Sequence, residues 1–185
     1  MKTWFQTPTA EEIKSVRAKY ALRRADRFTS LAVAGVLRCE GLDLAAIAGE
    51  RTALVTWSAL GPHRTVFATL DDILDYPEEL MLPTKFSHSV QNAAASYLGT
   101  ILRITGPTFA TTGFDDPKAE AFGLAKTLLR TGDCSRALVV GIAEKGALTA
   151  VLPKLMPERF ADEPDEGVDV ALLDAYDESD GGPVK

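Results

Sequence analysis

The sequence predicts an α/β domain, and two observations carry that prediction. In the middle of the chain, the β-prone segment Thr108–Thr112 precedes a largely apolar helical segment from Pro117 to about Thr131, and the buried-strand pattern of Arg136–Ala143 follows. Strand patterns also occur at Thr52–Trp57 and Val168–Ala175, with helical patterns between. Strands that alternate with helices indicate an α/β fold, and 185 residues fit a single domain.

The central unit carries local signals at its ends. Gly106-Pro107 turns the chain into the first strand. Asp116 is suited to cap the helix, Pro117 to occupy its first position, and Gly132 to end it. Most of the helix circumference is apolar, so we expect this helix to be covered on more than one side. The apolar residues are Ala119, Ala121, Phe122, Leu124, Ala125, Leu128 and Leu129.

The N-terminal third predicts a short strand at Lys2–Gln6 and two helices. Thr9 with Glu12 three residues later is a helix-start signature, and Asp26 is suited to cap the second helix. We expect the basic residues between them to form a solvated face, with a docking strip for an acidic partner as the alternative. These residues are Lys14, Arg17, Lys19, Arg23 and Arg24.

Helical spacing recurs in the middle of the chain, at Thr65–Tyr76 and from about His88 to Arg103. Pro77–Pro83 reads as a connection between them. Prolines and acidic residues predict a surface loop at Pro153–Asp165. We expect one domain over residues 1–175 and a disordered acidic tail at 176–185.

Composition excludes several classes of function. A net charge of −6 argues against nucleic acid as a partner, because phosphate binding needs a basic surface. No signal peptide begins the chain, and no apolar run reaches the roughly 20 residues of a membrane span. The two cysteines, Cys39 and Cys134, lack a redox or metal spacing, so we expect reduced thiols in the cytoplasm.

Several segments, in order, resemble the N-terminal half of a β-ketoacyl synthase, and within that family the chain-length-factor-like branch. The resemblance covers roughly residues 23–174. It implies one half of a thiolase-like fold: a βαβαβαββ mixed sheet with helices on both faces, and a central strand near Lys2–Gln6. The segments are Arg23–Ala32, Pro83–Tyr97, Gly106–Thr108, Arg130–Cys134, Ala137–Glu144 and Glu166–Leu173.

The chain departs from the family where the chemistry is expected. Counting back from Arg130-Thr131-Gly132, the position of the family's nucleophilic cysteine falls on Asp115. The family's two catalytic histidines belong to a second half that this sequence does not include, and neither His63 nor His88 lies in such a motif. The resemblance therefore implies a chain that cannot run the family's condensation by itself.

Each candidate site has a structural alternative that we favour. Asp115 and Asp116 suit helix capping better than general acid/base work, because the positive end of a helix favours their charged form. We expect His88 to be a cap or a hydrogen-bonded surface residue, His63 to be solvated in a turn, and Cys134 to be packed. The sequence has no phosphate loop, no HExxH motif and no His/Cys metal cluster, so we expect neither cofactor nor metal.

Half of a thiolase-like fold would leave its central helix exposed, so we expect oligomerisation. The family also dimerises through the strand after Gly-Pro. The resemblance thus implies a homodimer, or a heterodimer with a cysteine-containing ketosynthase, with acyl carrier protein as a further partner. Interface candidates are Thr108, Phe109, Ala110, Thr111, Phe122 and Leu128.

Three functional hypotheses follow. The first is a catalytically silent, chain-length-factor-like subunit of polyketide, aryl-polyene or fatty-acid-like biosynthesis. The second is a homo-oligomeric scaffold or binding module without acyl chemistry. The third is an acid/base enzyme that uses Asp115 or His88.

Overall fold

A computed structural model describes residues 1–80, 83–113, 115–160 and 166–175. The predicted tail at 176–185 lies outside these residues. Five strands form one mixed sheet in the order β1-β5-β4-β2-β3. Strands β2, β3 and β4 are parallel, and β5 runs antiparallel to both β1 and β4. The strands are β1 (Lys2–Gln6), β2 (Thr52–Ser58), β3 (Thr108–Thr112), β4 (Arg136–Ala143) and β5 (Gly167–Asp174).

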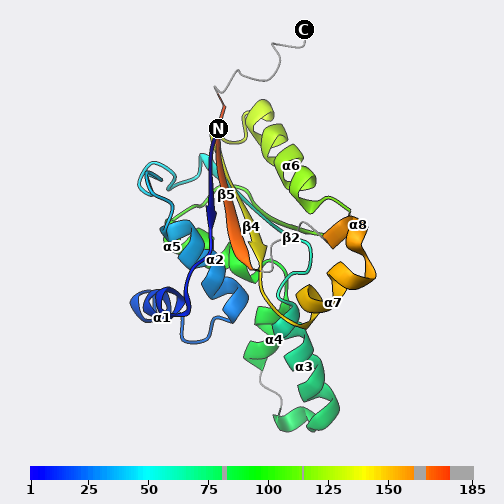
Figure 1. Ribbon diagram of the computed structural model, residues 1–185. Helices are drawn as coiled ribbons and strands as arrows, with labels where there is room; N and C mark the ends of the chain where they lie inside the picture. Colours follow the sequence, from blue (N-terminus) through cyan, green and yellow to red (C-terminus); the bar gives the residue numbers. More distant parts are fainter. Residues whose placement is uncertain (81–82, 114, 161–165, 176–185) are drawn as a thin grey trace.

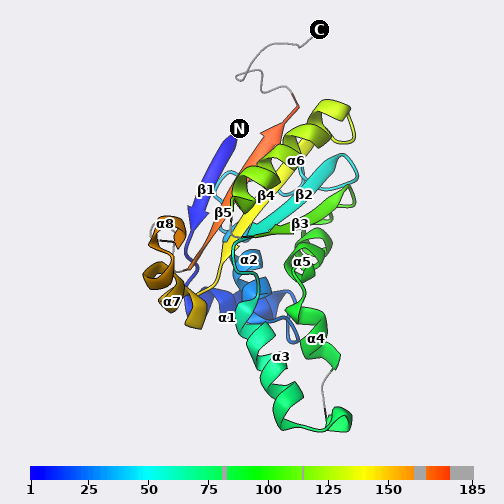
Figure 2. The same cartoon turned by 90° about the vertical axis from the view of Figure 1, so that its right-hand side faces the viewer.

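Helices lie on both faces of the sheet, as predicted (Figures 1 and 2). One face carries α2 and α5, and the other carries α6. The helices are α1 (Ala10–Lys19), α2 (Arg27–Leu37), α3 (His63–Asp75), the 3-10 helix η1 (Glu78–Leu80), α4 (Pro83–Ser89), α5 (Ala93–Leu102), α6 (Pro117–Thr131), α7 (Ala147–Leu155) and α8 (Pro157–Phe160). No helix in the described part of the chain has the length and apolar composition that crossing a membrane requires.

The larger core lies on the α2 face. Nine consecutive residues of α2, from Phe28 to Val36, are buried. A Cβ atom on Gly35 would lie 2.4 Å from the Cβ of Val168, so the missing side chain lets α2 lie close against β5. Asp26 caps α2 as predicted: its Oδ1 accepts a hydrogen bond from the backbone N–H of Thr29 at 2.8 Å.

Helix α6 has the predicted bounds but not the predicted burial. Its buried residues are Pro117, Ala121, Ala125 and Leu128, all on the side that faces the sheet. The opposite side is exposed and charged, so the expectation of cover on more than one side is wrong. Alanine and glycine made the helix look apolar without giving it a continuous apolar surface. The exposed charged residues of that side are Glu120, Lys126 and Arg130.

The remaining local signals are mostly confirmed, with three corrections. Thr9 and Glu12 form the predicted capping box. Strand β1 is at the edge of the sheet and not in its centre. The helix expected from His88 is two helices, α4 and α5, and η1 interrupts the predicted connection before them. The segment expected to be a loop, Pro153–Asp165, is partly helical: Pro153 lies inside α7, and α8 follows. Residues 161–165 of that segment lie outside the described part.

Helices α3, η1 and α4 form an arm that extends away from the sheet (Figures 1 and 2). Helix α4 packs against α3, and the Lys85 ammonium pairs with Asp72 across the two helices at 2.5 Å. The arm carries many of the exposed large apolar side chains of the described chain: Phe67, Leu70, Ile73, Leu74, Tyr76, Leu80, Phe86 and Val90.

Candidate functional site

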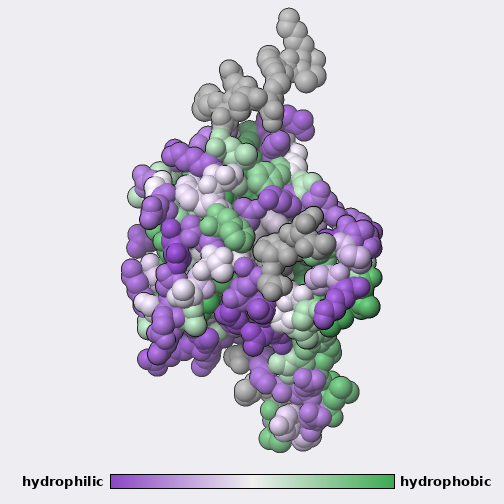
Figure 3. Space-filling view, in the orientation of Figure 1, coloured by the Kyte–Doolittle hydropathy of each residue, from purple (hydrophilic) through white to green (hydrophobic). Residues whose placement is uncertain are grey.

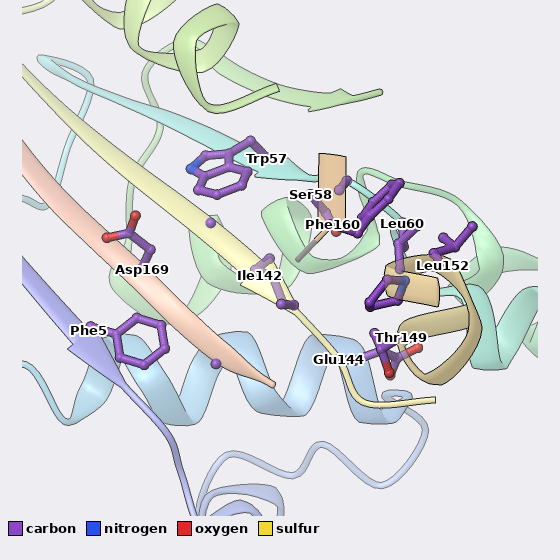
Figure 4. Close-up of a pocket in the computed structure, with 15 residues that line it drawn as sticks. Phe5, Trp57, Ser58, Leu60, Ile142, Glu144, Thr149, Leu152, Phe160 and Asp169 are labelled. Carbon is purple, nitrogen blue, oxygen red and sulfur yellow. The ribbon is translucent and has the colours of Figure 1, made fainter. Parts of the chain in front are cut away.

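A pocket lies at the carboxyl ends of β2 and β4, on the α6 face of the sheet, where α7 and α8 pack over the strand ends (Figure 4). In open α/β sheets this edge is the usual place for a ligand site. The free space is about 600 Å³, including open solvent at the mouth. The lining residues are Phe5, Trp57, Ser58, Ala59, Leu60, Gly141, Ile142, Ala143, Glu144, Thr149, Leu152, Pro153, Phe160, Gly167 and Asp169.

Two glycines make room for the aromatic part of this wall. Trp57 is paired with Gly141 across β2 and β4, and a Cβ on Gly141 would lie 2.3 Å from the indole ring. A Cβ on Gly167 would lie 2.4 Å from the ring of Phe5. Each ring therefore lies against a neighbouring strand at a position where any side chain would displace it.

Glu144 follows the last residue of β4 at the end of the pocket that also holds Thr149 (Figure 4). Its side chain is fully buried. One carboxyl oxygen, Oε1, accepts a hydrogen bond from the backbone N–H of Arg64 at 3.1 Å, whereas Oε2 has no partner in the described structure. Burial, aided by the nearby charge of Asp26, raises the pKa of the Glu144 carboxyl to about 7.

His63 lies behind Glu144, and its predicted exposure in a turn is wrong. It is the first residue of α3 and is only 3% exposed. Its Nδ1 lies 3.9 Å from Oε1 of Glu144, and neither ring nitrogen is hydrogen-bonded to the described residues. Burial lowers the pKa of the imidazole, so the neutral form is favoured. A Cβ on Gly146 would lie 2.2 Å from Nε2, so this glycine allows the close approach.

The N-terminus of α6 lies beside the pocket and holds the predicted aspartates. Asp116 caps the helix through a 2.8 Å hydrogen bond from the N–H of Ala119, as predicted. The Asp115 side chain is 88% exposed and pairs with Arg159 of α8 at 3.0 Å. The structure thus gives Asp115 an ion pair at the surface.

Lys118, in the first turn of α6, contacts two residues of the pocket wall. Its ammonium pairs with Asp169 of β5 at 2.6 Å and lies 5.7 Å from the centre of the Trp57 ring. Both contacts favour a positive charge at this point.

The other candidate residues lie elsewhere. His88 is near the end of α4, with its ring centre 5.7 Å from that of Tyr97. Cys134 is buried, as predicted, and burial raises the pKa of its thiol. Burial raises the pKa of Cys39 to about 11, so neither thiol is poised as a thiolate. Among the described residues, no group of three or more acidic, histidine or cysteine side chains could hold a metal ion.

The interface candidates divide into two groups. Thr108 and Phe109 are exposed, and Ala110 and Thr111 are partly buried, all on β3 at the free end of the sheet. Phe122 is partly buried on α6, and Leu128 is 9% exposed within the core between α6 and the sheet. The burial of Leu128 is therefore accounted for within this chain.

Sequence reasoning did not single out Glu144 or the pocket. A signal was present, because a carboxylate directly follows the apolar run Arg136–Ala143, and the carboxyl end of a parallel strand is a common place for functional residues. The partners of Glu144 come from distant parts of the sequence, and their burial depends on packing.

A scan against models of known families and a search of curated proteins find no match. Solved structures do match. The ishigamide ketosynthase/chain length factor is 19% identical, with a TM-score of 0.72 over 92% of this chain and 49% of that chain. A ketosynthase in complex with its chain length factor from Xenorhabdus doucetiae is 20% identical, with a TM-score of 0.64 over 94% of this chain and 76% of that one.

A β-ketoacyl synthase from Burkholderia phymatum STM815 is 16% identical, with a TM-score of 0.62 over 92% of this chain and 46% of that one. The chain thus has a thiolase-like fold and spans about half the length of the first of these neighbours. At such identities the likeness shows a shared fold and does not by itself show a shared activity.

Proposed function

We propose that this chain is a ketosynthase-like subunit without a nucleophile of its own, which pairs with an active ketosynthase and completes or shapes its acyl site. The observation that carries this proposal is the apolar surface of the arm. Leu74, Leu80 and Phe86 are 82%, 66% and 65% exposed, and Figure 3 shows hydrophobic residues along this extension. Exposed apolar surfaces of this kind mark protein interfaces.

The free edge of β3 extends this surface. Helix α5 packs against β3, α4 against α5, and α3 against α4, so the edge and the arm follow one another (Figure 2). The carbonyl of Pro107 accepts a hydrogen bond from the N–H of Leu54 in β2 at 2.9 Å. Because alternate residues of a parallel strand bond to opposite neighbours, the N–H of Ala110 points to the free edge and can pair with a second strand.

The site beside the pocket supports catalytic silence. Asp115, at the position that the resemblance gives to the nucleophile, is an exposed carboxylate paired with Arg159. The two thiols, Cys39 and Cys134, are buried with raised pKa values. Acyl transfer from a thioester would therefore depend on a cysteine of the partner.

The names of two structural neighbours include both a ketosynthase and a chain length factor, which supports a heterodimer over a homodimer as the assembly to test first. Polyketide or aryl-polyene biosynthesis in the cytoplasm would suit such a pair. The exposed basic side chains of Lys14, Lys19, Arg23 and Arg24 support acyl carrier protein as a transient partner.

The test is light scattering and ketosynthase turnover, with the chain alone and with a cysteine-containing ketosynthase from the same gene neighbourhood. We expect a one-to-one complex and a turnover that depends on it. Ala110→Pro should prevent pairing at the β3 edge without removing a hydrogen bond to β2. Asp115→Ala should leave turnover unchanged. A monodisperse monomer that does not bind the ketosynthase would overturn the proposal. A stable homodimer that does not bind it would favour the scaffold hypothesis.

A further inference from the structure

Helix α3 turns its apolar side away from the rest of the chain. On the side that faces the chain, Thr65 donates a hydrogen bond to Oδ2 of Asp26 at 2.8 Å. Thr69, which is buried, and Asp72, which pairs with Lys85, continue that polar side. A surface helix of a single domain normally does the reverse and turns its polar side outward. The apolar side of α3 is therefore suited to a surface outside this chain. Its exposed residues are Phe67, Leu70, Ile73 and Leu74.

Acidic side chains border this apolar side. Asp71 follows Phe67 by four residues and precedes Leu74 by three, so the three lie together on the helix. Asp75 lies one turn beyond Asp71, and Glu79 follows in η1; all three acids are exposed. Residues 70–80 contain five acidic residues and no lysine or arginine. The outer part of the arm is therefore both apolar and negatively charged, and Figure 3 shows hydrophobic and hydrophilic residues side by side at its end.

The placement of these carboxylates does not stabilise the free chain. Asp75 is the last residue of α3, whose last turn holds no basic residue, so its charge meets the negative end of the helix dipole. Asp71 and Asp75 are also like charges four residues apart, a spacing that destabilises a helix. Among the described residues, the ion pair of this stretch is that of Asp72 with Lys85. A placement that is unfavourable within the chain points to a function at this surface.

The charge of the arm distinguishes among possible partners. A second copy related by a two-fold axis would bring the same acidic surface opposite this one, and the like charges would repel. Helices that lie in a membrane surface carry lysine and arginine on their polar side, and anionic headgroups would repel this arm. A protein surface with an apolar groove and a basic border matches both the apolar residues and the acids.

We propose that the arm docks in an apolar groove of the ketosynthase whose border carries lysine and arginine side chains. The apolar residues of α3 enter the groove, and Asp71, Asp75 and Glu79 pair with the cations at its border. This inference rests on the pairing proposed above and adds the chemistry of the partner surface. Because the charge pairs lie at the border, they act mainly on the rate of association and on its dependence on salt.

The test is the binding of the full chain to the ketosynthase, measured by surface plasmon resonance at low and at high salt, about 50 mM and about 500 mM NaCl. The charge-reversal variant Asp71→Lys/Asp75→Lys should weaken binding about tenfold or more at low salt, chiefly through slower association, and much less at high salt. Lysine near the C-terminal end of α3 suits the helix dipole, so we expect this variant to fold. Glu79→Lys, outside α3, should act in the same direction by a smaller factor.

The matched control is Glu11→Lys/Glu40→Lys. It makes the same change in net charge as the double variant of α3, on two exposed residues outside the arm. We expect it to bind the ketosynthase like the wild type at both salt concentrations.

Two results would separate this inference from the pairing on which it rests. If the complex forms but the arm variants bind like the control at low salt, the pairing stands and the basic border is overturned. If the wild type forms no complex with the ketosynthase at either salt concentration, the proposed function fails and this inference fails with it.

Two further results would give the arm a different occupant and overturn the inference. The first is binding of the wild type, but not of Leu74→Ser, to phosphatidylcholine vesicles in a flotation assay, which would make the arm a membrane-binding surface. The second is a homodimer of the chain alone that Asp71→Lys/Asp75→Lys dissociates, which would place a second copy on the arm.

Discussion

Helices α2 and α6 lie on opposite faces of one sheet, and they differ in what covers them. Nine consecutive residues of α2 are buried between the sheet and its neighbouring helices. Helix α6 buries a narrow stripe, and its outer side is charged. Both sequences are rich in apolar and small residues, so the difference lies in where the charges fall. In α6, Lys126 and Arg130 lie away from the buried stripe; α2 has no charged residue after Arg27.

Because of this difference, the apolar surface that a partner would cover is not on α6. A half fold was expected to expose an apolar central helix, yet the outer side of α6 is suited to water. Most of the exposed large apolar residues of the described chain lie instead on the arm, on the edge strands and on α7. An assembly that buries them need not cover the outer side of α6.

The largest effect is expected from one substitution made in both helices. In α2, Gly35→Ala places a Cβ within 2.4 Å of Val168, so it should destabilise the fold by roughly 3 kcal/mol. In α6, Gly123 has no atom within 4 Å of the same position, so Gly123→Ala should stabilise the fold by up to about 1 kcal/mol through helix propensity. Urea unfolding of both variants measures the difference. A destabilising Gly123→Ala would show that the outer side of α6 is covered.

The next effect concerns Glu144, which lies between the N-terminus of α2 and the pocket on the α6 face. Because its folded-state pKa is raised from 4.5 to about 7, the folded state binds this proton more tightly, and stability is lost as pH rises between these values. Glu144→Gln should therefore gain stability relative to the wild type as pH rises from 5 to 8, on the order of 2 kcal/mol.

His63 acts in the opposite direction. Because the pKa of His63 is lowered, the folded state loses stability as pH falls below the ordinary value of 6.5. In the wild type this loss opposes the effect of Glu144, so its stability should change less with pH than the stability of Glu144→Gln. Urea unfolding at several pH values gives both profiles, with Glu120→Gln as the matched exposed control. If the difference in stability between Glu144→Gln and the wild type stays constant with pH, the raised pKa of Glu144 is contradicted.

The smallest effect compares the two aspartate caps. Asp116→Ala should cost about 1 kcal/mol, because it removes one exposed hydrogen bond to the start of α6. Asp26→Ala should cost about twice as much, because Oδ2 of Asp26 also accepts a hydrogen bond from Oγ1 of Thr65 at 2.8 Å. Thermal unfolding measures both, and Asp→Asn at each position keeps most of the cap as a control. Equal costs would show that the Thr65 bond contributes little.

The sequence correctly predicted the features that depend on residues close together in the chain. Gly106-Pro107 precedes β3, Asp116-Pro117 begins α6 and Gly132 ends it, and these bounds are correct. The capping box of Thr9 and Glu12 is equally local. The arrangement of strands and the half thiolase-like fold came from the resemblance, and the structural neighbours support them.

Burial was predicted less well, because it depends on residues far apart in the sequence. His63 looked exposed after Gly61-Pro62, but it is buried beside Gly146 and Glu144. The pocket brings Phe5, Trp57 and Phe160 together from three distant segments, and the glycines that admit the rings carry no signal in isolation. The charged residues of α6 were visible in the sequence. That they leave one side of the helix exposed to solvent is clear only once the buried stripe is known.

The strand order also constrains how the chain reaches this structure during synthesis. Within the described sheet, β1 bonds only to β5, so β1 pairs with a strand that is synthesised after β2, β3 and β4. Contacts of such long sequence separation form slowly, because a large loop must close first. Strands β2, β3 and β4 can assemble with their helices while β1 has no place to dock. A nascent chain should therefore hold residues 2–6 exposed until β5 emerges, which makes this strand the natural segment for a chaperone to bind.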